Sequence, residues 1–169
     1  MIGVAVLIVV LYGAQRLMNS SESADVSDVA SEVAMQSVTG QVLRVFEGEH
    51  VLDYSMDIPE TSTTTVSMEG ALLRVTEETN PLVTIYFSYE GGRGYTPLDY
   101  INNKIAPQVS VIDPVGTTTI GGLDWQVAES EGSEWRIAQV MNGEWLIVTE
   151  NKKSVHDIAD SILNSIVLK

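Results

Sequence analysis

The sequence of 169 residues contains no cysteine, only two histidines and only two phenylalanines. Without cysteine the chain has no disulfide, no thiol nucleophile, no zinc site with cysteine ligands and no lipid-modified cysteine anchor. Basic residues are also scarce, because nine Lys and Arg stand against 23 Asp and Glu and leave a net charge of -14. Such an acidic surface repels phosphate backbones and anionic lipid headgroups, so we expect no nucleic-acid partner.

Apolar residues, by contrast, are plentiful. Hydrophobic residues make up 44% of the sequence and charged residues 19%, a composition typical of a folded chain rather than a disordered one. Once an apolar N-terminal stretch is set aside, the length allows one domain of roughly 130 residues with its own core.

The N-terminal stretch, residues 2–14, reads I-G-V-A-V-L-I-V-V-L-Y-G-A and carries no charge. As a helix it would be about 20 Å long, short of the ~30 Å hydrocarbon core of a bilayer, but Leu17 and Met18 extend its apolar character. We expect residues 1–18 to form an uncleaved membrane anchor; a cleaved signal peptide and a buried core helix are the alternatives. Placing the following domain outside the cytoplasm rests on analogy with other anchored domains.

Residues 19–40 are rich in serine and acidic residues and are predicted to form a stalk or linker, in part helical. From residue 41 to residue 169 the patterns indicate a globular α+β domain. Alternating or β-branched runs predict strands at 41–47, 51–58, 63–67, 71–77, 82–89, 109–112, 117–120, 123–129, 134–141 and 144–150. Each of the last three predicted strands carries one tryptophan, which we expect in the core or under a helix.

Two local signals predict a helix start and a hairpin turn within this pattern. Thr96-Pro97-Leu98-Asp99 predicts a capped helix start with proline at the first helical position, and Pro107 should end that helix. Asn142-Gly143, between two alternating runs, predicts a hairpin turn in which both central residues have positive φ.

The last helix is predicted from an apolar stripe that begins at Val155, with Ser154 as its cap. At 100° per residue, His156 and Asp160 lie together on one flank of the stripe, and Asp157 lies on the far face. We interpret this flank as the solvated side of a packing helix and not as a site. His50 is likewise expected to be a solvated histidine at a strand edge.

No catalytic residue, cofactor site or metal site is predicted. The glycine-rich stretch 89–95 matches no phosphate-binding pattern, and its Tyr89, Arg93 and Tyr95 are instead the predicted contact surface. The acidic groups Glu47/Glu49, Glu77/Glu78 and Glu129/Glu131/Glu134 are interpreted as solvated strand ends, since no calcium-loop pattern accompanies them.

Several stretches resemble the PsbP-like domains, which include lumenal photosystem proteins and bacterial membrane-anchored relatives. They are I-P-E near residue 59, V-T-I-Y-F at 83–87, P-L-D-Y-I at 97–101, I-G-G-L-D-W at 120–125, the N-G-E-W-L-I-V hairpin and the final I-A-D-S-I-L-N-S-I. The resemblance covers residues 41–169. It implies a central antiparallel sheet covered by helices, an α/β/α sandwich, with a non-catalytic role in binding or assembly. It transfers no functional residue.

These observations favour a membrane-tethered, extracytoplasmic binding or assembly module whose partner is another protein, without catalytic activity. A pilin-like surface subunit is the first alternative, although Ala5 stands where many bacterial pilins keep a glutamate. An unrecognised hydrolase is the second.

Overall fold

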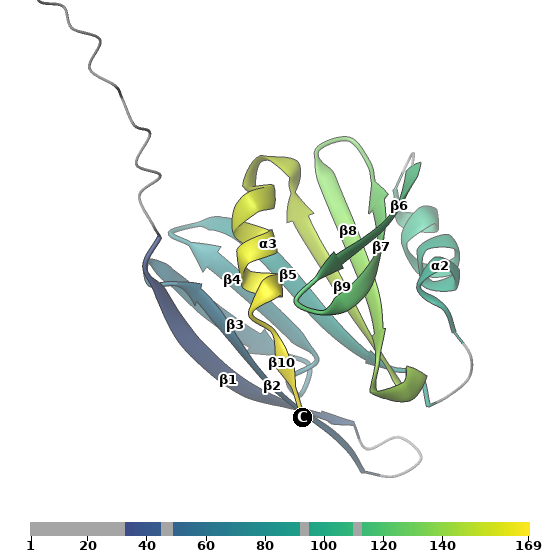
Figure 1. Cartoon of the computed structure of the whole chain (residues 1–169), viewed down its shortest axis with the longest axis horizontal. Coiled ribbons are helices and arrows are strands. Elements are labelled where there is room, and N and C mark those ends of the chain that lie inside the picture. The colour runs from purple at the N-terminus through teal and green to yellow at the C-terminus, as the bar shows by residue number, and fades with distance from the viewer. Residues whose placement is uncertain (1–32, 45–48, 92–94, 110–112) are drawn as a thin grey trace, which may run out of the picture. The chain divides into compact units, whose positions relative to one another are not determined.

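A computed structural model describes residues 33–169 except 45–48, 92–94 and 110–112. Within these ranges the chain is mostly antiparallel β structure, with ten strands in two sheets and two short helical segments packed on them (Figure 1). No helix in the described ranges has both the length and the hydropathy needed to cross a membrane. The predicted anchor at 1–18 and most of the predicted stalk lie outside the described residues.

The smaller sheet has three strands in the order β1-β2-β10. These strands are β1 (Met35–Arg44), β2 (His50–Pro59) and β10 (Val167–Leu168). β1 begins at Met35, inside the predicted stalk, because its side chain and that of Val38 pack on the main core while the backbone pairs with β2. In β2, every second residue is buried against the larger sheet: Leu52, Tyr54, Met56 and Ile58.

The larger sheet has seven strands in the order β3-β4-β5-β9-β8-β7-β6. Its strands are β3 (Ser62–Ser67), β4 (Leu72–Glu77), β5 (Asn80–Tyr89), β6 (Asp113–Ile120), β7 (Leu123–Glu129), β8 (Ser133–Val140) and β9 (Trp145–Lys152). The predicted single sheet is therefore two. The physical reason is that β2 buries one whole side against the core, so β1 and β2 cover the larger sheet instead of extending its edge.

Each face of the larger sheet carries one helical segment. On one face, α3 (His156–Asn164), preceded by the 3₁₀ turn η4 (Lys153–Val155), shares the main core with the smaller sheet. On the other face, the segment of α2 (Pro97–Tyr100), the π-helical η1 (Ile101–Ile105) and the 3₁₀-helical η2 (Ala106–Gln108) covers a second, smaller core. All three tryptophans are buried as predicted, Trp125 and Trp145 in the main core and Trp135 in the second.

The start of α2 confirms the predicted capping box. The hydroxyl of Thr96 accepts a hydrogen bond from the backbone N–H of Asp99 at 3.1 Å, and the Asp99 carboxylate accepts one from the Thr96 backbone N–H at 3.0 Å. The segment runs one residue past Pro107, to Gln108.

Two other local predictions need correction. Ser154 does not cap α3: it lies inside η4, the N-cap residue is Val155, and no side chain caps that end. The hairpin between β8 and β9 exists, but its turn is longer than Asn142-Gly143, because the last strand pair is Val140 with Trp145. Within this turn Met141 also adopts positive φ, and residues 141–143 form the 3₁₀ turn η3 (Met141–Gly143).

Candidate functional site

A buried arginine is the centre of the most polar part of the core. Arg136 lies in β8, its side chain is 1% exposed, and it projects from the sheet face covered by α3. Its Nη2 pairs with the carboxylates of Glu134 and of Asp160, the latter at 2.5 Å, and its Nη1 donates to Oδ1 of Asn151 at 3.2 Å. A buried guanidinium requires such partners, because an unpaired charge in the core is strongly destabilising.

His156, in the first turn of α3, also faces this arginine. Its Nδ1 lies 2.9 Å from Nη2 of Arg136 and 3.2 Å from Oε2 of Glu134, while its Nε2 lies 3.4 Å from Oδ2 of Asp160. Because arginine only donates, Nδ1 accepts in that contact, and Nε2 is the ring nitrogen that faces Asp160. We call Glu134, Arg136, Asn151, His156 and Asp160 the Arg136 cluster.

The flank of α3 therefore differs from the prediction. His156 and Asp160 do share one flank, and their side chains are 47% and 37% exposed, but the flank packs against a charged residue of the sheet. Glu134 differs more clearly from the predicted solvated strand end, since it is buried. The reason is α3 itself, which covers the end of β8 and excludes water from one side of the strand.

A cleft of about 240 Å³ opens beside this cluster, between α3 and the outer strands of the larger sheet. We call it the α3 cleft. Its walls come from β6, β7, β8 and α3, and include Gly116, Thr118, Val127, Glu129, Glu134, Arg136, His156 and Asp160. Its three carboxylates, Glu129, Glu134 and Asp160, outnumber the two cations paired with them, Arg136 and Lys153, so the cleft attracts cationic rather than anionic groups.

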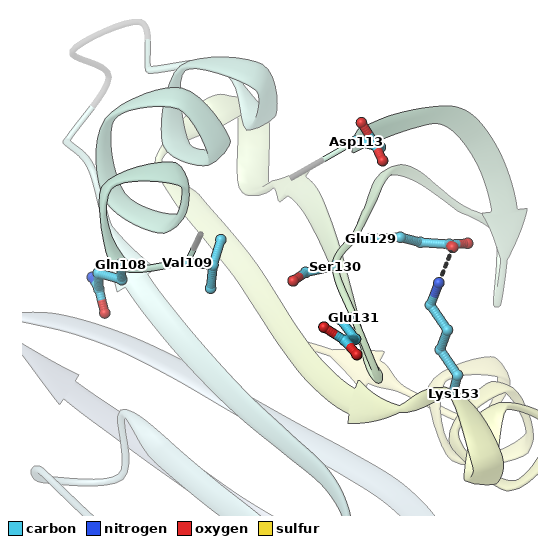
Figure 2. A pocket seen from close by; sticks show the side chains of 7 residues that line it. All are labelled: Gln108, Val109, Asp113, Glu129, Ser130, Glu131 and Lys153. Carbon is cyan, nitrogen blue, oxygen red and sulfur yellow. Dashed lines mark hydrogen bonds and ion pairs between the residues drawn. The ribbon is translucent and has the colours of Figure 1, made fainter. Parts of the chain in front are cut away.

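A larger hollow of about 630 Å³ adjoins the cleft and shares Glu129 with it. Figure 2 shows Lys153 reaching from the turn before α3 to the Glu129 carboxylate, with which it forms an ion pair. Asp113 and Glu131 line the same hollow, so its lining is also predominantly acidic. In the described residues, no group of three or more His, Asp or Glu side chains is arranged to hold a metal ion.

An aromatic hollow of about 320 Å³ lies on the opposite face of the sheet, beneath α2, and is lined in part by Tyr86, Tyr100 and Trp135. Burial, and to a smaller extent the neighbouring Tyr86 and Glu90, raise the pKa of Tyr100 to about 12. Its hydroxyl is therefore neutral at physiological pH.

The predicted contact surface is only in part described. Arg93 lies outside the described residues. Tyr89 is half-buried, with its ring stacked on His50 at a centroid distance of 3.9 Å and edge-on to Trp145 at 5.1 Å, so it is a packing residue. Tyr95 is also half-buried, and its carbonyl accepts from the Gln139 side chain at 3.5 Å. His50, predicted to be a solvated histidine at a strand edge, is instead half-buried, with its ring stacked on Tyr89.

The sequence matches no known protein-family model and no curated protein. Sequence reasoning missed the Arg136 cluster, although one signal was present: Glu134 and Arg136 alternate with Trp135 and Ile137. A strand whose two faces are charged and apolar should be solvated on the charged face, unless another element covers it.

Proposed function

We propose that this protein is a membrane-tethered, extracytoplasmic binding or assembly module that has no catalytic activity. The observation that carries this proposal is that both histidines contact other side chains of the fold. The ring of His50 is stacked on Tyr89, and Nδ1 of His156 accepts from the buried Arg136. Both therefore contribute to packing, while the surface offers exposed strand edges and shallow acidic clefts of the kind that protein partners contact.

The tether rests on the uncharged residues 2–14 and the serine-rich, acidic residues that follow. We further propose that the domain is a PsbP-like α/β/α sandwich. Two features support this: a helical segment on each face of the larger sheet, and a C-terminal helix packed on the main core.

Fractionation of cells that make the full-length chain tests the tether. We expect the protein in the membrane fraction, resistant to carbonate and released by detergent, with the domain digested by protease added outside the cell. The variant Ile8→Arg/Val9→Arg should lose membrane association, because each charge is costly at the bilayer centre, whereas Ile8→Leu/Val9→Leu should keep it. A soluble wild-type chain would overturn the tether.

Activity assays and microscopy test the non-catalytic role. A hydrolytic activity that is present in the wild type and lost in His50→Ala or His156→Ala, with the fold intact, would overturn it. Filaments in electron micrographs that depend on residues 1–18 would favour the pilin-like alternative.

A further inference from the structure

The outer edge of β6 is one of the two edges of the seven-stranded sheet, since β6 pairs only with β7. Residues 116–119, Gly-Thr-Thr-Thr, are all exposed and carry no charge. Exposed edges usually carry lysine, proline or a bulge that discourages pairing with other chains. The bulge of β6 lies between Pro114 and Gly116, so the three threonines beyond it form a regular, β-branched edge.

The hairpin geometry fixes which backbone groups point outward. β6 and β7 are joined by Gly121 and Gly122, both with positive φ, and the closing pair is Ile120 with Leu123. In a two-residue hairpin the closing pair is hydrogen-bonded, and pairs alternate from there. The N–H and C=O groups of Thr117 and Thr119 therefore face away from β7. In the part of the chain that the structure describes, no other backbone group bonds to them.

The other edge of this sheet, β3, is less open. Its neighbour β1 bonds near both of its ends: the Gln36 side chain donates to the Ser62 carbonyl at 3.1 Å, and the Leu43 N–H donates to the Glu69 carbonyl at 3.1 Å. A strand added beside β3 would have to displace these contacts. The β6 edge has no such neighbour among the described residues.

The side chains of a strand added beside β6 would alternate between the two faces of the sheet. Gly116, Val127 and Arg136 are successive cross-strand partners, and all three line the α3 cleft. Because Gly116 has no side chain, and a Cβ built there would meet nothing within 4 Å, the cleft is open toward the added strand. A side chain opposite Gly116 would extend directly into the cleft.

The charge of the cleft selects the partner. The three carboxylates of Glu129, Glu134 and Asp160 exceed by one the cations that pair with them, Arg136 and Lys153, so the cleft still favours cationic side chains. A second copy of this chain is disfavoured at the same edge, because two clefts of like charge, on chains of net charge -14, would face each other. A basic extended segment would hydrogen-bond to the outward backbone groups of β6 and place its positive charges next to the carboxylates of the α3 cleft.

We propose that the outer edge of β6 binds an extended, basic segment of a partner protein by strand addition, with cationic side chains entering the α3 cleft over Gly116. This inference deepens the proposed binding function and rests on it. The partner is identified by its chemistry: a stretch of β-forming residues that carries Lys or Arg at alternate positions.

The test uses the full-length chain in detergent micelles and a fluorescent synthetic peptide of alternating Lys and Val. We expect binding by fluorescence anisotropy, weakening as salt rises, and slower hydrogen exchange at the amides of Thr117 and Thr119 in the complex. A peptide with Glu in place of Lys, and one N-methylated at alternate residues, should not bind. Failure of the Lys peptide to bind overturns the proposal, as does equal binding of the methylated peptide.

Two substitutions at one position separate the backbone from the side chain. Thr119→Pro removes an outward N–H and leaves the ladder to β7 intact, so it should weaken peptide binding about tenfold. Thr119→Val keeps the N–H and should bind normally, although it loses the hydroxyl bond to Asp124. Unchanged tryptophan emission and melting temperature establish that each variant is folded. Equal affinity of the two variants would overturn strand addition.

The outcomes also separate this inference from the proposed function. If the wild-type chain is associated with membranes but the peptide does not bind, the proposed tether is supported and the proposed binding at the β6 edge is wrong. If the peptide binds but the chain is soluble in cells, the edge stands and the tether is wrong. Dimers of the chain that Thr119→Pro abolishes would reassign the edge to a second copy and overturn the basic partner.

Discussion

Nη2 of Arg136 lies 2.9 Å from Nδ1 of His156, and this contact joins the last helix to the centre of β8. The two residues differ greatly in exposure, 1% for the arginine side chain and 47% for the histidine. The arginine is thus reached by solvent-facing groups of α3 while remaining buried itself. Docking of α3 and burial of the charge depend on each other.

The first prediction concerns this mutual dependence. Arg136→Met removes the guanidinium and leaves the buried Glu134 without its ion-pair partner, so we expect a loss of about 3 kcal/mol in the free energy of unfolding. Chemical denaturation followed by tryptophan fluorescence measures this, because all three tryptophans are buried.

A double variant provides the control for that loss. Arg136→Met/Glu134→Leu removes both buried charges and should be more stable than Arg136→Met alone. If the double variant is less stable than the single one, Glu134 does not depend on the arginine.

The second prediction concerns the contact between the sheets. Gly70 has φ of 86°, and a Cβ there would lie 2.1 Å from the carbonyl oxygen of Gln41 in β1. Gly70→Ala should therefore destabilise the protein by about 3 kcal/mol, from backbone strain and the clash together. Gly132, with φ of 81° and open space around it, is the matched control, and Gly132→Ala should cost only about 1 kcal/mol. Equal losses would mean that β1 yields to the new methyl group.

The third prediction concerns alkaline pH. The pKa of Tyr100 is raised from 10.0 to about 12, so the fold favours its neutral form. Its contribution to stability is complete below pH 10, the pKa of the unfolded state, and is lost as pH rises through about 12. Tyr100→Phe cannot ionise, so its melting temperature should fall less steeply across this range than that of the wild type. Tyr95→Phe, which lies outside the aromatic hollow, should follow the wild type.

The fourth prediction concerns acid. The Thr96 side chain, and then its backbone N–H, lower the pKa of Asp99 below its ordinary 3.8 by donating hydrogen bonds. The charged capping box thus contributes to stability above pH 3.8, and this contribution is lost as pH falls through the lower pKa of the folded state. The difference in melting temperature between wild type and Asp99→Asn should therefore shrink below pH 3.8. If the difference in melting temperature stays constant, the charge of Asp99 is not the cause of the stabilisation.

Local signals explain which parts of the fold the sequence could predict. The capping box at Thr96 and Asp99 depends on four adjacent residues, and the strands depend on alternation along a few positions. Pairing of β1 with β2 on top of the larger sheet depends instead on which face of β2 is covered, and this is decided by distant residues. The Arg136 cluster could not be predicted from the sequence for the same reason, since α3 approaches Glu134 only in the folded chain.

The hydrogen bonds of Gln36 have a mechanical consequence. β1 is antiparallel to β2, and its first pair joins Met35 to Pro59. A pull from the preceding residues on Met35 would therefore load the hairpin one pair at a time, starting at this end, rather than shearing all the pairs together. The Gln36 side chain donates to the Ser62 carbonyl at 3.1 Å and lies next to the first pair to open. This hydrogen bond therefore opposes the opening of that pair. Under tension β1 would separate from β2 first, while β6, which belongs to the other sheet, would remain paired.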